Sequence, residues 1–211
     1  GTRTRRGTLA VTVATAGLVA ILGLALVESL PTWAFDGGPL IALGGLAALA
    51  GTYLSLALIV LIARVPWIER EVGHQRLVAL HRKVAPYALV LIGAHVLLTT
   101  LGYAQEARTG PLAELWTIVA HSAWMVPAAT AFVLMVAMGV LSYRRIRARM
   151  SHETWWVAHL YFYLAVALAF GHQIELGSFF AGRPVQQAVW IGLYAAVALL
   201  VIGARVALLA G

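Results

Sequence analysis

Long apolar runs separated by short polar segments dominate the chain. Six of these runs reach about 20 residues, the length that an α-helix needs to cross roughly 30 Å of hydrocarbon. They predict six membrane-spanning helices, at about residues 8–27, 39–63, 78–103, 115–142, 155–176 and 185–209. The first run is too long for the apolar region of a signal peptide, and the sequence Glu28-Ser-Leu-Pro after it is a poor cleavage site. We therefore expect the first run to remain as an anchor, and the chain to form one all-α bundle in lipid.

The composition agrees with this pattern. The chain is 62% hydrophobic and 11% charged, with a mean hydropathy of +0.88, whereas soluble domains carry about 25% charged residues. A net charge of +7 would fit a nucleic-acid partner, but the basic residues lie between the apolar runs, so none is expected. The chain has no Cys, which excludes thiolate-bound zinc and iron–sulfur clusters. Any cofactor must therefore be held by His or by oxygen ligands.

Lys and Arg fall unequally on the two sides of the predicted bundle. The side of the termini carries Arg3, Arg5, Arg6, Arg64, Arg70, Arg76, Arg82, Lys83, Arg144, Arg145, Arg147, Arg149 and Arg205. The other side carries only Arg108 and Arg183. Because cytoplasmic segments are enriched in positive residues, we expect both termini in the cytoplasm and the third and fifth helices to run outward. The connection at 64–76 is interpreted as a short amphipathic surface helix or, equally well, as a solvated loop.

Four histidines bracket the third and fifth predicted helices. His81 and His95 are fourteen residues apart, and His159 and His172 are thirteen apart. At 1.5 Å per residue, each pair spans about 20 Å of helix. Since the two helices run in parallel, His81 shares an inner depth with His159, and His95 shares an outer depth with His172. Polar groups inside a bilayer are costly and usually functional, so the sequence predicts two tiers, each with one imidazole from each helix.

Each tier suits a haem, with one imidazole on either side of the iron. Zinc fits poorly because neither tier has a third His, Asp or Glu at its depth. The plainer alternative is four interior histidines without a cofactor. One geometric detail needs explanation, since a thirteen-residue spacing leaves His159 and His172 about 140° apart around an ideal helix. We therefore expect the fifth helix to be tilted, locally overwound or bulged, with Gly171 as the expected place.

These spacings resemble the ferric reductase-like transmembrane domain of the NADPH oxidase and ferric reductase superfamily. The stretch Arg64-Val-Pro-Trp-Ile-Glu and the dipeptide His81-Arg82 resemble its bacterial members. The resemblance covers essentially all of residues 1–211 as one domain. It implies a six-helix bundle in the bacterial inner membrane with two stacked haem b groups. By this resemblance, His81 and His159 ligate the inner haem, and His95 and His172 the outer one.

The resemblance also implies a route for electrons, from NADPH through FAD and the two haems to a small extracytoplasmic acceptor such as ferric iron or oxygen. The sequence has no glycine-rich dinucleotide motif. FAD and NADPH are therefore expected on a domain that follows the sixth helix or, failing that, on a separate reductase subunit. Two alternatives stay open: a di-haem subunit that takes electrons from quinol or a separate flavoprotein for a periplasmic partner, and a proton-relaying transporter. The transporter would need broken helices and midplane acidic residues, which the sequence does not predict.

Departures from the family pattern concern the outer haem. NADPH oxidases carry a further His four residues beyond the outer ligand of the third helix, where this chain has Thr99, and an Arg that the second helix lacks. Dedicated superoxide production is therefore not expected, and Thr99 and His121 are the candidates for contact with the acceptor. Near the inner haem, Arg82, Lys83 and the basic cluster at 144–149 are placed to pair with propionates, although anchoring at the membrane surface also explains them.

The remaining polar and aromatic residues near the tiers have simpler interpretations. His74 and His152 are interpreted as exposed loop histidines, and Trp155 and Trp156 as interfacial tryptophans. Glu175 and Arg183 are interpreted as loop charges.

Overall fold

The computed structural model describes residues 2–210, and the side chains of all of these except 2–7, 10, 144, 145 and 208–210. Within this range every regular element is a helix. The elements are α1 (Thr2–Ser29), the 3₁₀ segment η1 (Leu30–Ala34), α2 (Gly38–Ile62), α3 (Pro66–Val72), α4 (His74–Ala107), α5 (Pro111–Ala120), α6 (Met125–Leu141), α7 (Arg144–Arg147), α8 (His152–Leu176) and α9 (Pro184–Ala210).

Five segments are long and apolar enough to cross a membrane, and a sixth span is obtained if α5 and α6 are counted together. The five are Val11–Ala34, Gly38–Ile62, His74–Ala107, His152–Leu176 and Pro184–Ala207. Neighbouring helices leave most of this apolar surface uncovered: the buried share of the most apolar window ranges from 6% in the first segment to 39% in the second. The chain is therefore a multi-pass membrane protein whose exposed apolar side chains face lipid.

The prediction of one continuous span at 115–142 is wrong. The chain leaves α5 after Ala120, and α6 begins at Met125 in a direction bent by 120°. Pro127 supplies a physical reason. It has no N–H to donate to the carbonyl oxygen of Ala123, so a helix that continued from α5 would lack this hydrogen bond. Met125 N donates instead to Ser122 O at 3.0 Å, which closes a turn. The chain therefore contains one broken helix pair, a feature expected of a proton-relaying transporter, although the break at 121–124 contains no acidic residue.

The connection between α2 and α4 contains a short helix, α3. Of the two interpretations of residues 64–76, a short helix or a solvated loop, the structure shows the helix. The Arg64 guanidinium lies 3.2 Å from a carboxylate oxygen of Glu69 in the first turn. This hydrogen-bonded pair holds the pKa of Glu69 below its ordinary value. Because the pair joins the segment after α2 to the first turn of α3, it fixes the direction in which the chain leaves α2.

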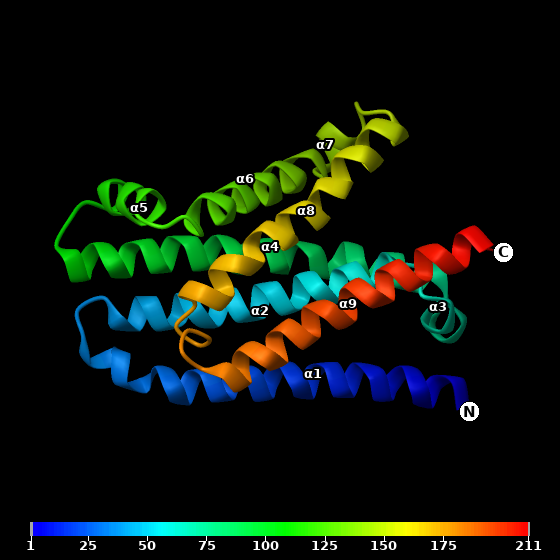
Figure 1. The fold of residues 1–211 in the computed structure, drawn as a ribbon. Coiled ribbons are helices and arrows are strands. Elements are labelled where there is room, and N and C mark those ends of the chain that lie inside the picture. The colour runs from blue at the N-terminus through cyan, green and yellow to red at the C-terminus, as the bar shows by residue number, and fades with distance from the viewer. Residues whose placement is uncertain (1, 211) are drawn as a thin grey trace.

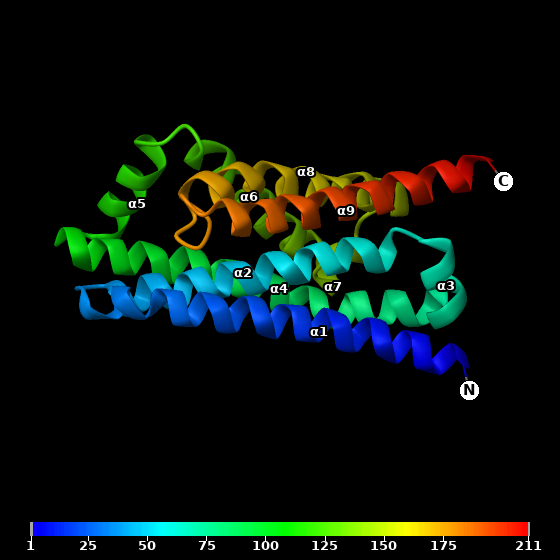
Figure 2. The same cartoon turned by 60° about the horizontal axis from the view of Figure 1, so that its bottom comes forward.

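The helices pack in two groups. The most extensive contacts are between α2 and α4, followed by those between α6 and α8. Figure 2 shows α8 and α9 passing over the layer formed by α1, α2 and α4. Among the described residues, α4 and α8 have hardly any close backbone approaches to each other, although α8 crosses α4 obliquely (Figure 1). Side chains must therefore bridge these two helices.

Both chain ends and α3 lie at one end of the bundle, and α5 lies at the other (Figure 1). This arrangement fits an even number of crossings. The assignment of the first end to the cytoplasm stays a prediction, and the side chains of Arg3, Arg5, Arg6, Arg144 and Arg145, which contributed to it, lie outside the described residues.

Helix α8 is continuous through Gly171, so the expected bulge at this residue is not found. Helix α8 runs obliquely over α4 (Figure 1), in agreement with tilt, one of the three expected distortions. Gly171 has a different role, because a Cβ atom there would collide with the indole ring of Trp124. The missing side chain lets the break between α5 and α6 pack directly on α8.

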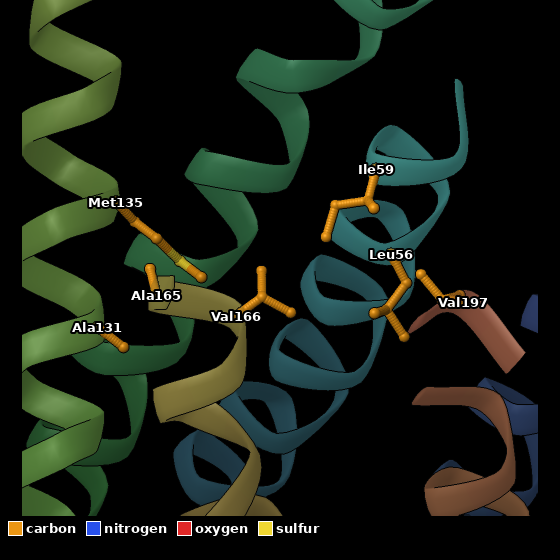
Figure 3. Close-up of a cluster of buried hydrophobic side chains, with 7 residues drawn as sticks. All are labelled: Leu56, Ile59, Ala131, Met135, Ala165, Val166 and Val197. Carbon is orange, nitrogen blue, oxygen red and sulfur yellow. The ribbon is translucent and has the colours of Figure 1, made fainter. Parts of the chain in front are cut away.

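A cluster of buried apolar side chains joins the two groups of helices between the histidine tiers (Figure 3). Ala165 and Val166 of α8 lie about midway between His159 and His172 in the sequence, and both are buried. The cluster consists of Leu56 and Ile59 from α2, Ala131 and Met135 from α6, Ala165 and Val166 from α8, and Val197 from α9. It forms an apolar layer across the middle of the bundle.

Glycines allow the backbones of α2 and α4 to approach closely. A Cβ atom on Gly44 would lie 2.6 Å from Thr99 Cγ2, and one on Gly51 would lie 2.8 Å from Ile92 Cδ1. On α4, a Cβ atom on Gly102 would lie 2.8 Å from the carbonyl oxygen of Gly37. Gly37, Gly44 and Gly51 recur every seven residues, a period that keeps one face of a helix against its neighbour. Small residues at such an interface are a common basis of helix association in membranes.

This packing predicts that Gly102→Ala destabilises the protein by roughly 1–3 kcal/mol, because the new methyl group must displace backbone atoms of α2. The measurement is the thermal unfolding midpoint of the purified protein in detergent. Gly93→Ala on the same helix is the matched control, since a Cβ atom there would meet nothing within 4 Å. Equal midpoints for the two variants would contradict the close approach.

Candidate functional site

Four histidines bridge the gap between α4 and α8 at two levels. At one level, the ring centroids of His81 and His159 are 6.1 Å apart, with an interplanar angle of 67°. At the other, those of His95 and His172 are 6.4 Å apart, with an angle of 30°. The structure thus brings together the same two pairs that the sequence placed at equal depths. We call them the inner pair (His81 and His159) and the outer pair (His95 and His172).

The separation of the rings suits a metal ion shared by each pair. A metal–nitrogen distance of about 2.0 Å puts the ion about 3 Å from each imidazole centroid, so that two rings on opposite sides of it are about 6 Å apart. Direct hydrogen bonding or stacking of two imidazoles would bring them closer. Both pairs therefore leave room for one ion between the rings.

No group of three or more His, Asp or Glu side chains that could hold a bare metal ion occurs among the described residues. Two imidazoles alone do not complete the coordination of zinc. In a haem, the macrocycle supplies the other four nitrogen ligands, and the protein needs to provide only the two axial ones. The donor set of each pair therefore fits a bis-histidine haem better than a free ion.

Helix α2 orients the two histidines of α4. His81 Nδ1 lies 3.2 Å from Leu58 O, and His95 Nδ1 lies 3.0 Å from Gly44 O. Because a carbonyl oxygen only accepts, both Nδ1 atoms carry the proton, and both Nε2 atoms keep a lone pair for a metal. Fourteen residues separate the two acceptors, as they do the two histidines. One antiparallel register therefore serves both tiers.

The histidines of α8 lack such partners. The Nδ1 atoms of His159 and His172 are buried, and neither has a partner in hydrogen-bond geometry among the described residues. The carbonyl of Ala169, three residues earlier, lies near His172. Burying a polar nitrogen without a partner is unfavourable. The two α8 rings are therefore held mainly by their apolar and aromatic neighbours.

Two cavities reach the outer pair. Their volumes are about 280 Å³ and about 540 Å³, and both are lined by His95, His172, Thr52 and Gln173. Most of the lining is apolar, with side chains from α2, α4, α5, α6, α8 and α9. Sites for small molecules and cofactors commonly have volumes of about 300–1,000 Å³. The outer pair thus borders a space of the size that a flat cofactor requires.

The other candidates from the sequence lie near the tiers, but those whose side chains are described form no hydrogen bond to the histidine rings. Thr99 lines the larger cavity, and its hydroxyl donates to His95 O at 2.6 Å. His121 lines the same cavity, but its Nδ1 atom contacts Thr117 O at 2.8 Å. Arg82 and Lys83 are exposed beside His81. Their roles toward an acceptor or a propionate stay predictions.

The charges and loop histidines at the ends of the bundle have identifiable surroundings. Arg183 forms an ion pair with Glu28 of α1, which places it in the lining of the larger cavity and not in an open loop. His74 lies 3.8 Å from a carboxylate oxygen of Glu69. His152 and Glu175 are exposed. Arg183 is therefore more than a simple loop charge.

Gln173, which the sequence analysis did not single out, links three helices beside the outer pair. Its Oε1 accepts hydrogen bonds from Trp190 Nε1 at 2.7 Å and from Tyr194 Oη at 3.2 Å, and its Nε2 donates to Thr52 Oγ1 at 3.4 Å. Trp190 is only 1% exposed. The sequence did contain a signal for this role: an amide side chain next to a histidine within an apolar run. Amide groups inside a membrane need hydrogen-bond partners on neighbouring helices.

Comparison with known proteins identifies a family. The family described as "Ferric reductase like transmembrane component" matches residues 46–170, a segment that contains both inner histidines and His95, with His172 just beyond it. Neither the curated proteins nor the solved structures include a match. The matched segment is more than half of the chain and includes most of the bundle that presents the histidine pairs. The chain therefore belongs to the ferric reductase-like transmembrane family.

Proposed function

We propose that this protein transfers electrons across the membrane through two haem b groups, one held by the inner pair and one by the outer pair. Membership of a ferric reductase-like family supports transmembrane electron transfer and an oxidoreductase activity. The observation that carries the haem assignment is the spacing of the rings, 6.1 and 6.4 Å, at two levels of the same two helices.

In this proposal the protein holds the carriers, and the haem iron supplies the one-electron chemistry. His81 and His95 offer Nε2 to the metal because their Nδ1 protons are committed to carbonyls of α2. The apolar cluster that includes Leu56, Met135 and Val166 supplies nonpolar surroundings between the tiers. Exclusion of water by such surroundings would strengthen electrostatic interactions and protect the carriers from side reactions.

We infer that electrons enter at the inner pair and leave at the outer pair. The excess of Arg and Lys on the side of the termini supports a cytoplasmic location for the inner pair. The donor is then a flavin–NADPH domain or a reductase subunit, and the acceptor is small and extracytoplasmic. The cavity of about 540 Å³ at the outer pair, with polar side chains such as Glu114 and His121 in its lining, supports access for that acceptor.

The first prediction from this proposal concerns haem content. The purified protein should bind two haem b groups, measured by pyridine haemochrome and by a reduced-minus-oxidised spectrum. His95→Ala or His172→Ala should remove one haem and leave the inner one bound, because only the outer haem would lose an axial ligand. His121→Ala is the matched control and should keep both, since its exposed ring belongs to neither pair. Full haem content with unchanged bis-imidazole spectra in both outer-pair variants would refute the assignment, and a colourless protein would favour the transporter.

The second prediction concerns the acceptor. We expect ferric chelates to be reduced faster than oxygen, because Thr99 occupies the position at which the oxidases carry His and its hydroxyl is bound to His95 O. The assay uses protein reconstituted with a flavin donor and compares ferric reduction with superoxide release. Superoxide formed in proportion to donor consumption, at rates rivalling those with ferric chelates, would count against this prediction.

The third prediction concerns the donor. NADPH alone should leave the haems of the 211-residue chain oxidised, whereas dithionite should reduce them, because the sequence contains no glycine-rich dinucleotide motif. Absorbance of the reduced haem provides the readout, and addition of a flavoprotein reductase serves as the positive control. Reduction by NADPH without any flavoprotein would show that the chain has a nucleotide site of its own.

A further inference from the structure

The inner-pair histidine on α8 is covered by a stack of side chains from the nearest end of the bundle. The indole of Trp155 lies nearly parallel to the imidazole of His159, with centroids 4.8 Å apart and an interplanar angle of 23°. Trp155 precedes His159 by four residues, so both side chains lie on the same face of the first turns of α8. A tryptophan that only anchors a helix at the membrane surface does not need to stack on an imidazole, as Trp155 does.

A cation also lies against this indole. The guanidinium carbon of Arg147 lies 4.7 Å from the Trp155 ring centroid. Arg147 Nη1 also donates to Met150 O at 3.2 Å, and Ser151 caps α8 by accepting from Thr154 N at 3.1 Å. The short turn from α7 to α8 therefore holds Arg147 over the ring. The same indole contacts both the cation and the imidazole.

We propose that Arg147 and Trp155 are positioning residues that set the orientation of the His159 ring and raise the reduction potential of the inner haem. This inference rests on the proposed function. His159 Nδ1 has no hydrogen-bond partner among the described residues to fix its ring, so the stacked indole restricts it instead. Arg147 carries a permanent positive charge because its guanidinium stays protonated. A fixed cation favours the state of the site with one more electron.

The two tiers differ in this respect. The position four residues before His172, the α8 histidine of the outer pair, is occupied by Leu168, which carries neither a charge nor an aromatic ring. Among the described residues, a cation stacked on the aromatic neighbour of an axial imidazole therefore occurs only at the inner pair. Such an arrangement makes the inner haem the better acceptor for an electron that arrives from a cytoplasmic flavin.

A plainer explanation is that Arg147 and Trp155 only anchor the end of α8 at the membrane surface, as Arg and Trp commonly do. The chain offers a matched control for each residue. Arg149 carries the same charge two residues later and is exposed, and Trp156 is the neighbouring indole and is 49% exposed. If these residues only anchor the helix, substitution of Arg149 should have the same effect as substitution of Arg147. Substitution of Trp156 should likewise have the same effect as substitution of Trp155.

The test is a potentiometric titration of the purified, haem-loaded protein, with the His95→Ala background used to assign the inner haem. Arg147→Gln should lower the ferrous-to-ferric ratio of the inner haem at a fixed potential by ~tenfold, which corresponds to 59 mV for a one-electron couple. Arg147→Lys should retain most of the wild-type ratio, and Arg149→Gln should change it less than twofold. The outer haem should be unaffected by all three.

The orientation of the ring is tested by electron paramagnetic resonance of the oxidised protein. Trp155→Leu should shift the low-spin signal of the inner haem, Trp155→Phe should shift it less, and Trp156→Leu should leave it unchanged. Equal effects of Arg147→Gln and Arg149→Gln, or an unchanged inner potential in Arg147→Gln, would overturn the inference even if a Trp155 variant fails to fold. Absence of haem from the wild-type protein would instead overturn the proposed function.

Discussion

The bundle depends on one constraint: four imidazoles lie between two helices whose backbones, among the described residues, hardly approach each other. Helix α2 meets half of this requirement with two backbone carbonyls, of Gly44 and Leu58, which receive the Nδ1 protons of the α4 histidines. The glycines of α2 are part of the same arrangement, because they let α4 come close enough for an imidazole to reach the backbone. Packing and the chemistry of the site are therefore inseparable along this interface.

The two helices of the site solve the same problem in different ways. On α4 a hydrogen bond to the backbone fixes each ring and its tautomer, whereas on α8 both Nδ1 atoms are buried without a partner among the described residues. His159 relies on the indole of Trp155, and His172 lies next to Gln173, whose amide ties α8 to α2 and α9. The α8 side of each tier is consequently the more sensitive to side-chain packing, and the α4 side to the position of the α2 backbone.

Much of the architecture could be predicted because hydropathy and histidine spacing can be read directly from the sequence. The long apolar helices and the family follow from those patterns, and the family match agrees. The break between α5 and α6 was missed because 115–142 is apolar almost throughout, and its main signal was Pro127. The carbonyl partners on α2 could not be predicted, since every residue has a carbonyl and only the helix register selects Gly44 and Leu58. The role of Trp155 was hidden because an indole at a helix end is expected at any membrane surface.

The break between α5 and α6 also changes how the protein fits its bilayer. Helix α6 has 17 residues and rises about 25 Å, which is shorter than the roughly 30 Å of a typical hydrocarbon core. A short span is accommodated by local thinning of the bilayer or by flanking segments at the interface. Helix α5, bent by 120° from α6, is the segment that flanks it at this end. The bilayer beside α6, next to the outer pair, is therefore expected to be thinner than elsewhere around the bundle. Membranes of different thickness should alter how far the outer pair lies from water, without any change in the protein's own contacts.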